Sequence, residues 1–145
     1  MAATKAREVM TPDTSCVGEN DTALDAAKRM KDEQIGALPI CGEDDRLKGM
    51  ITDRDITVSV VAEGRDPSST RVGDLAQGEV VTIGADDDID TAIQTMVDHG
   101  VRRLPVIDGH RMVGVVSQAD LARELPPERA GELLAGISEQ PSDRQ

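Results

Sequence analysis

Two segments of the same pattern carry the groups best suited to chemistry. Residues 49–55 read GMITDRD and residues 114–120 read GVVSQAD. Each runs from a glycine through two apolar residues to a hydroxyl residue three positions before an aspartate: Thr52 and Asp55 in one, Ser117 and Asp120 in the other. The glycine admits close approach of a backbone or a ligand, and the apolar pair continues a strand into the start of a helix.

Two interpretations of this pattern stay open. In a capping box the hydroxyl accepts from a helix amide, and the acid reaches back to the amide of the capping residue. In an anion site the hydroxyl donates to a phosphate at the helix N-terminus, while the aspartate accepts from the two hydroxyl groups of a ribose. Capping boxes normally use Glu or Gln at the acidic position, so the shorter aspartate in both copies weakens the capping interpretation.

Two adjacent arginines form a second candidate group. Arg102 and Arg103 stand at the start of a predicted strand. They suit a phosphate, or they are solvated side chains paired with nearby acids such as Asp98. The other copy has Gly36-Ala37 at this place, so the two copies are not equivalent if the arginines bind a ligand.

Cysteine and histidine give no ligand-spaced pattern. Cys16 and Cys41 are too few for a disulfide framework or a zinc ribbon, so they are small buried residues, one bridge or a redox pair. His99 and His110 fall in different elements, and neither has a companion spaced for a metal. No nucleophile is paired with a base, so we expect neither a metal site nor an enzyme.

Composition excludes several classes of partner. The chain has 145 residues, with 16 Lys and Arg against 28 Asp and Glu, and a formal net charge of −12. This charge repels nucleic acid and anionic lipid at long range, so we expect no nucleic-acid or membrane partner. We recognise no signal peptide and no run of roughly 20 apolar residues, which predicts a cytoplasmic protein. Phe, Tyr and Trp are absent, so no ring can stack on a base.

The sequence repeats itself. Residues 35–40 read IGALPI and residues 101–106 read VRRLPV, and the same spacing lays Met30 on Met96. The hydroxyl–aspartate segments are offset by one residue less than the LP strands, because the turn between these two features is one residue shorter in the second copy. Surface turns tolerate such a change. The chain therefore consists of two copies of one repeat.

Each copy predicts the order β-α-β-β-α, which makes the fold a mixed α/β (α+β) class. Short strands around 15–17 and 80–83 precede helices whose expected apolar faces are Leu24, Ala27 and Met30 in one copy, and Ile89, Ala92, Ile93 and Met96 in the other. The crossover makes the first two strands parallel neighbours, and the next two form a hairpin. Proline in the second strand suits an edge or a strand start. Closing helices are expected at about 53–62 and 118–125.

We expect a single module over residues 1–145. Repeat one covers about 5–62 and repeat two about 72–125, joined by a linker at about 63–71 that is rich in turn formers. Residues 126–145 form a C-terminal tail. A copy of this length buries little surface alone, so the two copies should pack sheet to sheet around one core, as one pseudo-twofold module.

With an LP strand before each G-x-x-[TS]-x-x-D segment, residues 5–125 resemble two tandem CBS motifs, a Bateman module. The resemblance implies regulation rather than catalysis, and no required cofactor. It implies an adenosine-containing ligand (AMP, ADP, ATP or S-adenosylmethionine) in clefts between the paired motifs. It also implies a homodimer and an unknown target protein on a separate chain.

The resemblance assigns roles by position. Asp55 and Asp120 would hold ribose, Thr52 and Ser117 would approach phosphate, and Arg54, Arg102 and Arg103 would neutralise it. Adenine would be held by aliphatic and backbone groups around Val17, Ala37, Leu38 and Pro39 in one copy, and around Val81, Ile83, Leu104 and Pro105 in the other. The difference between Gly36-Ala37 and Arg102-Arg103 implies that one site is better formed than the other.

The same fold would place the two cysteines on neighbouring parallel strands. We therefore hypothesise a conditional disulfide between Cys16 and Cys41, with free thiols in a reducing cytoplasm. Two alternatives to nucleotide binding stay open: a stress-associated interaction protein without nucleotide affinity, and a redox switch built on these cysteines.

Overall fold

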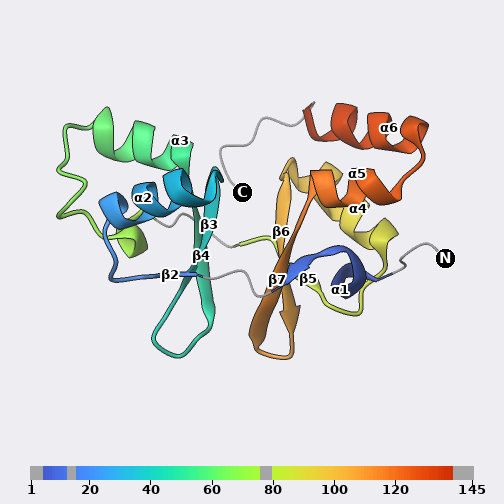
Figure 1. Cartoon of the computed structure of the whole chain (residues 1–145), viewed down its shortest axis with the longest axis horizontal. Coiled ribbons are helices and arrows are strands. Elements are labelled where there is room, and N and C mark those ends of the chain that lie inside the picture. Colours follow the sequence, from blue (N-terminus) through green and yellow to red (C-terminus); the bar gives the residue numbers. More distant parts are fainter. Residues whose placement is uncertain (1–4, 13–15, 76–79, 139–145) are drawn as a thin grey trace. The chain divides into compact units, whose positions relative to one another are not determined.

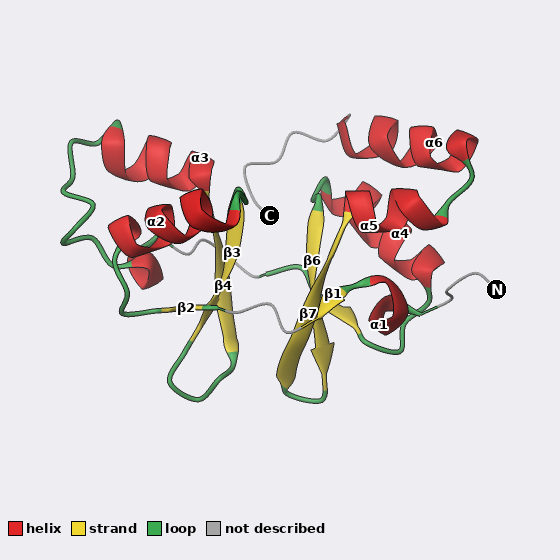
Figure 2. Cartoon of the chain, in the orientation of Figure 1, coloured by secondary structure: helices red, strands yellow, loops and turns green. Residues whose placement is uncertain are grey.

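The computed structural model describes residues 5–12, 16–75 and 80–138 (Figure 1). These residues divide into two compact units. Residues 16–75 with Val80 form the first unit, and residues 5–12 with 81–138 form the second unit. Each unit contains helices and a mixed sheet, so the predicted α/β class with two β-α-β-β-α copies is confirmed (Figure 2).

The first unit is built on a sheet with the strand order β2-β3-β4. β2 runs parallel to β3, and β3 runs antiparallel to β4, as a crossover followed by a hairpin requires. Helices α2 and α3 lie beside this sheet (Figure 1). The elements are β2 (Val17–Gly18), α2 (Ala23–Glu33), β3 (Ala37–Cys41), β4 (Leu47–Thr52), α3 (Asp53–Ile56), the π-helical turn η1 (Thr57–Val61) and the 3-10 turn η2 (Val72–Asp74).

The second unit has the same arrangement with one strand more. Its sheet has the order β1-β7-β6-β5, in which β5 is parallel to β6 and the other pairs are antiparallel. The elements are α1 (Ala6–Val9), β1 (Thr11–Pro12), β5 (Ile83–Gly84), α4 (Ile89–His99), β6 (Arg103–Asp108), β7 (Arg111–Ser117), α5 (Gln118–Glu124) and α6 (Pro127–Ser138).

The opening segment of the chain packs in the second unit. Ala6 is fully buried there, its amide donates to the carbonyl of Asp87 at 2.9 Å, and β1 pairs with β7. Arg7 forms ion pairs with Asp86 at 2.9 Å and with Asp108 at 3.3 Å. Residues 5–12 therefore open the first repeat in sequence but complete the unit that contains most of the second.

The opening segment of the second repeat packs in the first unit in the same manner. The amide of Val72 donates to the carbonyl of Asp21 at 2.8 Å, and the amide of Gly73 donates to that of Glu19 at 2.9 Å. Val72 and Leu75 are buried in the core of the first unit. The units thus differ from the repeats drawn on the sequence, since each unit takes the opening segment of the other copy.

Each unit has a hydrophobic core of its own. The sequence predicts one core shared by both copies, but the buried hydrophobic side chains of the described residues divide into two clusters. The first contains Val17, Ala23, Ala26, Met30, Leu38, Ile40, Ile51, Val60, Val72 and Leu75. The second contains Ala6, Ile83, Ala85, Ile89, Ala92, Met96, Val101, Leu104, Val106, Val116, Leu121, Leu133 and Ile137.

The C-terminal tail contributes to the second core. Helix α6 lies along α4 and α5, and its residues Leu133 and Ile137 are buried (Figure 1). These two residues are four positions apart, which places them on one face of the helix. No helix of the described residues has the length and apolar character needed to cross a membrane.

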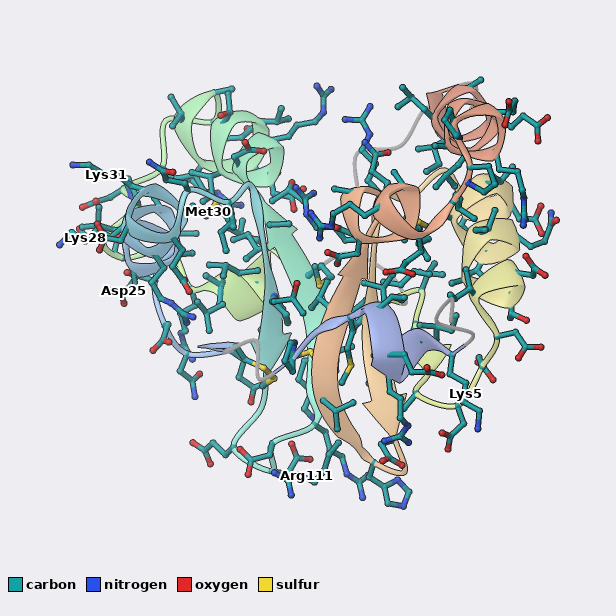
Figure 3. The ribbon with its side chains drawn as sticks, turned by 45° about the vertical axis from the view of Figure 1, so that its right-hand side comes forward. Lys5, Asp25, Lys28, Met30, Lys31 and Arg111 are labelled. Carbon is teal, nitrogen blue, oxygen red and sulfur yellow. A yellow bond between two sulfur atoms is a disulfide. The ribbon has the colours of Figure 1, made fainter. Side chains whose placement is uncertain are left out.

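The buried face of α2 differs from the sequence prediction by one position. Ala23, Ala26 and Met30 are buried, whereas Leu24 and Ala27 are half-buried. The sequence prediction chose the larger Leu24, whereas the residues buried with Met30 are two alanines. Figure 3 shows Lys28 and Lys31 on the outer side of α2, while Met30 turns toward the strands.

Both strand prolines lie in central strands, as the third residue of each, whereas the sequence favoured an edge or a strand start. Pro39 is in β3, between β2 and β4, and Pro105 is in β6, between β5 and β7. The parallel pairing of β3 begins only at Ile40, and that of β6 only at Val106. Each proline therefore stands one residue before its strand is paired on both sides, so the parallel pairing begins after the residue that lacks an amide hydrogen.

Candidate functional site

The two hydroxyl–aspartate segments form reciprocal capping boxes. Thr52 N donates to Asp55 Oδ2 at 2.8 Å, and Asp55 N donates to Thr52 Oγ1 at 3.1 Å. In the second unit Ser117 N donates to Asp120 Oδ2 at 2.9 Å, and Asp120 N donates to Ser117 Oγ at 3.1 Å. The argument that aspartate is too short for this role is wrong, because its carboxylate spans the distance at both sites.

A third box of the same type begins α2. Thr22 N donates to Asp25 Oδ2 at 3.1 Å, and Asp25 N donates to Thr22 Oγ1 at 3.1 Å. The hydrogen bond from the amide of Thr22 helps to hold the pKa of the exposed Asp25 carboxyl below its usual value. Neither Thr22 nor Asp25 is a candidate ligand residue. This pair therefore forms the same cap outside the candidate site. Asp88 at the start of α4 has no side-chain capping bond.

The start of α3 has little capacity left for an anion. Its first three amides already donate: Asp53 N to Gly36 O at 2.9 Å, Arg54 N to Asp53 Oδ1 at 2.8 Å, and Asp55 N to Thr52 Oγ1. A phosphate at this place would have to be met by side chains instead of helix amides. In α5 the first amide is used in the same way, because Gln118 N donates to Arg102 O at 2.9 Å.

The capping hydroxyls keep one capacity that a ligand can use. Thr52 Oγ1 and Ser117 Oγ each accept from an amide, and within the described part of the chain neither hydroxyl donates to another group. Ala37 lies directly opposite Thr52 across β3 and β4, and Arg103 lies directly opposite Ser117 across β6 and β7. Directly opposed side chains are close enough to contact one molecule.

The two aspartates differ in what their second oxygen does. Asp55 is half-buried, and among the described residues its carboxylate is bonded to Thr52 alone. Asp120 is buried, and its Oδ1 accepts from Arg123 Nη2. Arg123 was not a candidate from the sequence, although the spacing of Asp120 and Arg123 on a helix is one at which side chains meet.

The apolar candidates fall into two groups by burial. Val17, Leu38, Ile83 and Leu104 have side chains that belong to the hydrophobic cores. Ala37, Pro39 and Pro105 are buried but belong to neither core, and Val81 is half-buried. Along a strand successive side chains alternate between faces, so Ala37 and Pro39 lie on the sheet face opposite Leu38.

Two of the three arginine candidates are more exposed than the other candidate residues. Arg54 and Arg102 are exposed, and Arg103 is half-buried. Asp98, the acid considered as a partner for the arginine pair, accepts from Gln94 Nε2 at 2.6 Å.

Cys16 and Cys41 form a disulfide, with their Cα atoms 5.6 Å apart. The bridge joins the start of β2 to the end of β3, which are the parallel neighbours that the repeat predicts. Arg29 Nη1 donates to the carbonyl of Cys16 at 2.7 Å, which further fixes this corner of the first unit. Val17, one of the adenine candidates, is the next residue after Cys16.

No group of three His, Cys, Asp or Glu side chains in the described parts of the chain is close enough to hold a metal ion. His99 Nδ1 lies 3.0 Å from the carbonyl of Thr95, and His110 is exposed in the turn between β6 and β7.

The sequence model of the CBS domain family matches the chain twice, over residues 6–61 and 72–127. The chain belongs to the CBS domain family. It is 48% identical to Hypoxic response protein 1 of Mycobacterium tuberculosis over 123 residues, 85% of this chain and 86% of that protein. A crystal structure of Hypoxic Response Protein I with two coordinated zinc ions has a TM-score of 0.79 and covers 85% of this CBS chain and 100% of its own.

Two more distant CBS structures share the fold of this chain. CBSX2 in complex with AMP has a TM-score of 0.72 at 19% identity, over 83% of this chain and 95% of its own. The CBS domain pair of MJ0100, in complex with 5′-methylthioadenosine and S-adenosyl-L-methionine, has a TM-score of 0.74 at 24% identity, over 85% and 95%.

Proposed function

We propose that this CBS protein is a regulatory module that binds an adenosine-containing ligand and controls a separate protein without catalysing a reaction. The observation that carries the proposal is the carboxylate of Asp55. One of its oxygens is fixed by the amide of Thr52, and the other is free of partners among the described residues. A fixed, half-buried carboxylate with an unused oxygen is an acceptor for the hydroxyl groups of a ribose.

The neighbouring groups fit the rest of such a ligand. The hydroxyl of Thr52 donates to a phosphate oxygen, and Arg54 supplies the opposing charge. In the second unit Ser117 and Arg103 do the same from opposite strands, with Arg102 beside them. Adenine is held by backbone groups and by the small face of Ala37 and Pro39, because the chain has no aromatic residue.

The distant relatives in complex with AMP and with S-adenosyl-L-methionine support this class of ligand. Binding would act as a signal because a ligand that binds the folded state stabilises it. A ligand present at 100 times its Kd adds about 2.7 kcal/mol to the free energy of unfolding. A target protein that recognises the stabilised conformation would then respond to the ligand concentration.

The test compares Asp55→Asn with Asp25→Asn. Asparagine keeps an oxygen that accepts from the capping amide, but it replaces the second oxygen by a donor. We measure AMP, ADP, ATP and S-adenosylmethionine by titration calorimetry and by thermal unfolding in circular dichroism. Asp55→Asn should weaken binding by about 1–3 kcal/mol, and Asp25→Asn should bind like the parent.

Equal binding by both variants and the parent would remove Asp55 from the site. Absence of binding at millimolar concentration of all four compounds would contradict nucleotide regulation, and would favour an interaction protein without nucleotide affinity.

A homodimer belongs to the same proposal. Val58 and Val61 are large hydrophobic residues on the closing helical segment of the first unit, and they are 47% and 64% exposed. Covering them in a dimer would remove apolar surface from water. Light scattering should give the mass of a dimer for the parent and of a monomer for Val61→Asp; a monomeric parent would contradict the proposal.

A redox switch is a second candidate function, which the Cys16–Cys41 bridge favours. Its position next to Val17 would let reduction loosen the strand that borders the adenine face. Ligand affinity measured with and without reductant separates the two functions: a redox switch needs a change, and a plain nucleotide sensor needs none.

A further inference from the structure

Both oxygens of the Asp120 carboxylate accept hydrogen bonds, one from the cap of α5 and one from within that helix. Oδ2 accepts from the amide of Ser117 at 2.9 Å, and Oδ1 accepts from Arg123 Nη2. The Asp120 side chain is only 7% exposed, so few directions of approach remain for a third donor. The Arg123 side chain is 71% exposed, so its guanidinium can leave for solvent without disturbing the core.

The first unit has no such arginine. The spacing that lays Asp55 on Asp120 lays Val58 on Arg123. Val58 is on η1, three residues after Asp55, and its side chain offers no hydrogen-bond donor. The two aspartates therefore share the capping geometry but differ in whether the second oxygen is available.

The basic groups of the second unit gather at the same junction. Arg103 lies opposite Ser117 across β6 and β7, Arg102 precedes it, and Arg123 is one helical turn beyond Asp120. At the corresponding strand position of the first unit stand Gly36 and Ala37. The junction at Asp120 thus has Arg102, Arg103 and Arg123, whereas at the matching positions around Asp55 the first copy has Gly36, Ala37 and Val58, with Arg54 as its nearby arginine.

We infer that Arg123 occupies the ribose position of Asp120 and makes that site selective for anionic nucleotides; this rests on the proposed function. A neutral nucleoside that binds the Asp120 carboxylate must break its ion pair with Arg123. Such a ligand has no negative group with which the displaced guanidinium can pair. A nucleotide brings a phosphate with which Arg123 can pair once it has left the carboxylate. The site at Asp55 needs no such exchange and accepts a nucleoside with or without a phosphate.

The experiment uses adenosine and AMP on the full chain, with sites counted by titration calorimetry. To observe Asp120 alone, the ligands are titrated into Asp55→Asn. In that background AMP should bind and adenosine should bind at least about tenfold more weakly, the ratio expected for one hydrogen bond to a charged group. Adding Arg123→Gln should remove most of this preference, by strengthening adenosine and weakening AMP.

Two further variants control the interpretation. Arg129→Gln removes a surface arginine of the same unit that pairs with Asp90 at 2.9 Å, and it should leave the preference unchanged. Val58→Arg, made in the parent chain together with Asp120→Asn, places an arginine three residues after Asp55 and should weaken adenosine more than AMP. Circular dichroism checks that each variant is folded, and light scattering shows whether Val58→Arg also changes the oligomer.

The outcomes separate the two levels of the proposal. If AMP binds Asp55→Asn but adenosine binds equally well, and Arg123→Gln changes neither, the role of Arg123 is overturned while nucleotide binding stands. If neither ligand binds the parent or any variant, the proposed function fails and the role of Arg123 falls with it.

Discussion

The backbone amides of Thr52 and Asp55 each donate to the side chain of the other residue, at 2.8 and 3.1 Å. The groups that would hold a ribose and a phosphate are therefore the same groups that begin the closing helix. A substitution here changes stability and binding together. The structure supplies the means to separate the two effects, because Thr22 and Asp25 have the same cap away from the candidate site.

The capping threonine of α2 should matter for stability alone. Thr22→Ala removes the acceptor for the amide of Asp25, which should lower the free energy of unfolding by about 1 kcal/mol. Urea unfolding followed by circular dichroism measures this, since the chain has no Trp or Tyr for fluorescence. Thr95→Ala is the matched control, because Thr95 is inside α4 and its hydroxyl donates to the carbonyl of Thr91, a bond that does not favour a helix. Equal losses in both variants would show that the Thr22 cap is not the cause.

Reduction of the Cys16–Cys41 bridge should destabilise the chain. The bridge closes a sequence separation of 25, for which the chain-entropy model gives a stabilisation of about 3 kcal/mol. Thermal unfolding with reductant should therefore begin several degrees lower, and Cys16→Ser/Cys41→Ser should match the reduced parent with or without reductant. Mass analysis after alkylation confirms the thiol state. An unchanged midpoint with fully reduced thiols would contradict this contribution.

The ion pair of Arg7 with Asp86 should make the opening segment sensitive to acid. The hydrogen bond and charge of Arg7 lower the pKa of the Asp86 carboxyl in the folded chain. A lowered folded-state pKa stabilises the fold above the ordinary pKa near 3.8, and this contribution is lost as the pH falls through the lowered value. Carboxyl NMR should show the pKa of Asp86 return toward its ordinary value in Arg7→Gln. The same pKa in both proteins would contradict the pairing.

Gly114 should be required for docking of the opening segment. A Cβ at Gly114 would lie 2.5 Å from the carbonyl oxygen of Thr11, a backbone atom that cannot move without displacing β1. We expect Gly114→Ala to cost about 1–3 kcal/mol of stability, as overpacking does, and to increase hydrogen exchange in residues 5–12. Gly131→Ala is the control, because a Cβ there meets nothing within 4 Å and alanine favours a helix. Unchanged exchange in residues 5–12 of Gly114→Ala would contradict the packing of β1.

The sequence was sufficient for the order and pairing of the elements, because the two copies support one another. The paired LP strands and the hydroxyl–aspartate junctions mark where strands and helices meet. The partner of each opening segment could not be predicted in this way. The segments containing Ala6 and Val72 each carry an apolar residue to bury, but a hydrophobic pattern shows that a residue is buried and not which copy covers it.

The sequence predicted the matched positions of the two aspartates, but not the difference between their surroundings. Asp55 and Asp120 occupy matched places, yet the sequence comparison of the two copies passed over Val58 and Arg123 because neither belongs to the repeated pattern. The sequence also did not predict that Leu38 and Leu104 are buried in the cores. Alternation along a strand identifies two faces but does not show which face joins the core. The hydrogen bond from Arg123 to Asp120 Oδ1 can be recognised only from the three-dimensional positions of the side chains.

The packing of residues 5–12 with residues 81–138 sets an order of events during synthesis. The first unit is contiguous and has all its strands and its η2 turn once residue 80 has left the ribosome. Ala6 and β1 are made earliest, but β7, with which β1 pairs, is made more than one hundred residues later. Residues 5–12 therefore remain without their partner strand while residues 16–75 fold. A nascent chain stopped before β7 should have a protected first unit and protease-sensitive residues 5–12.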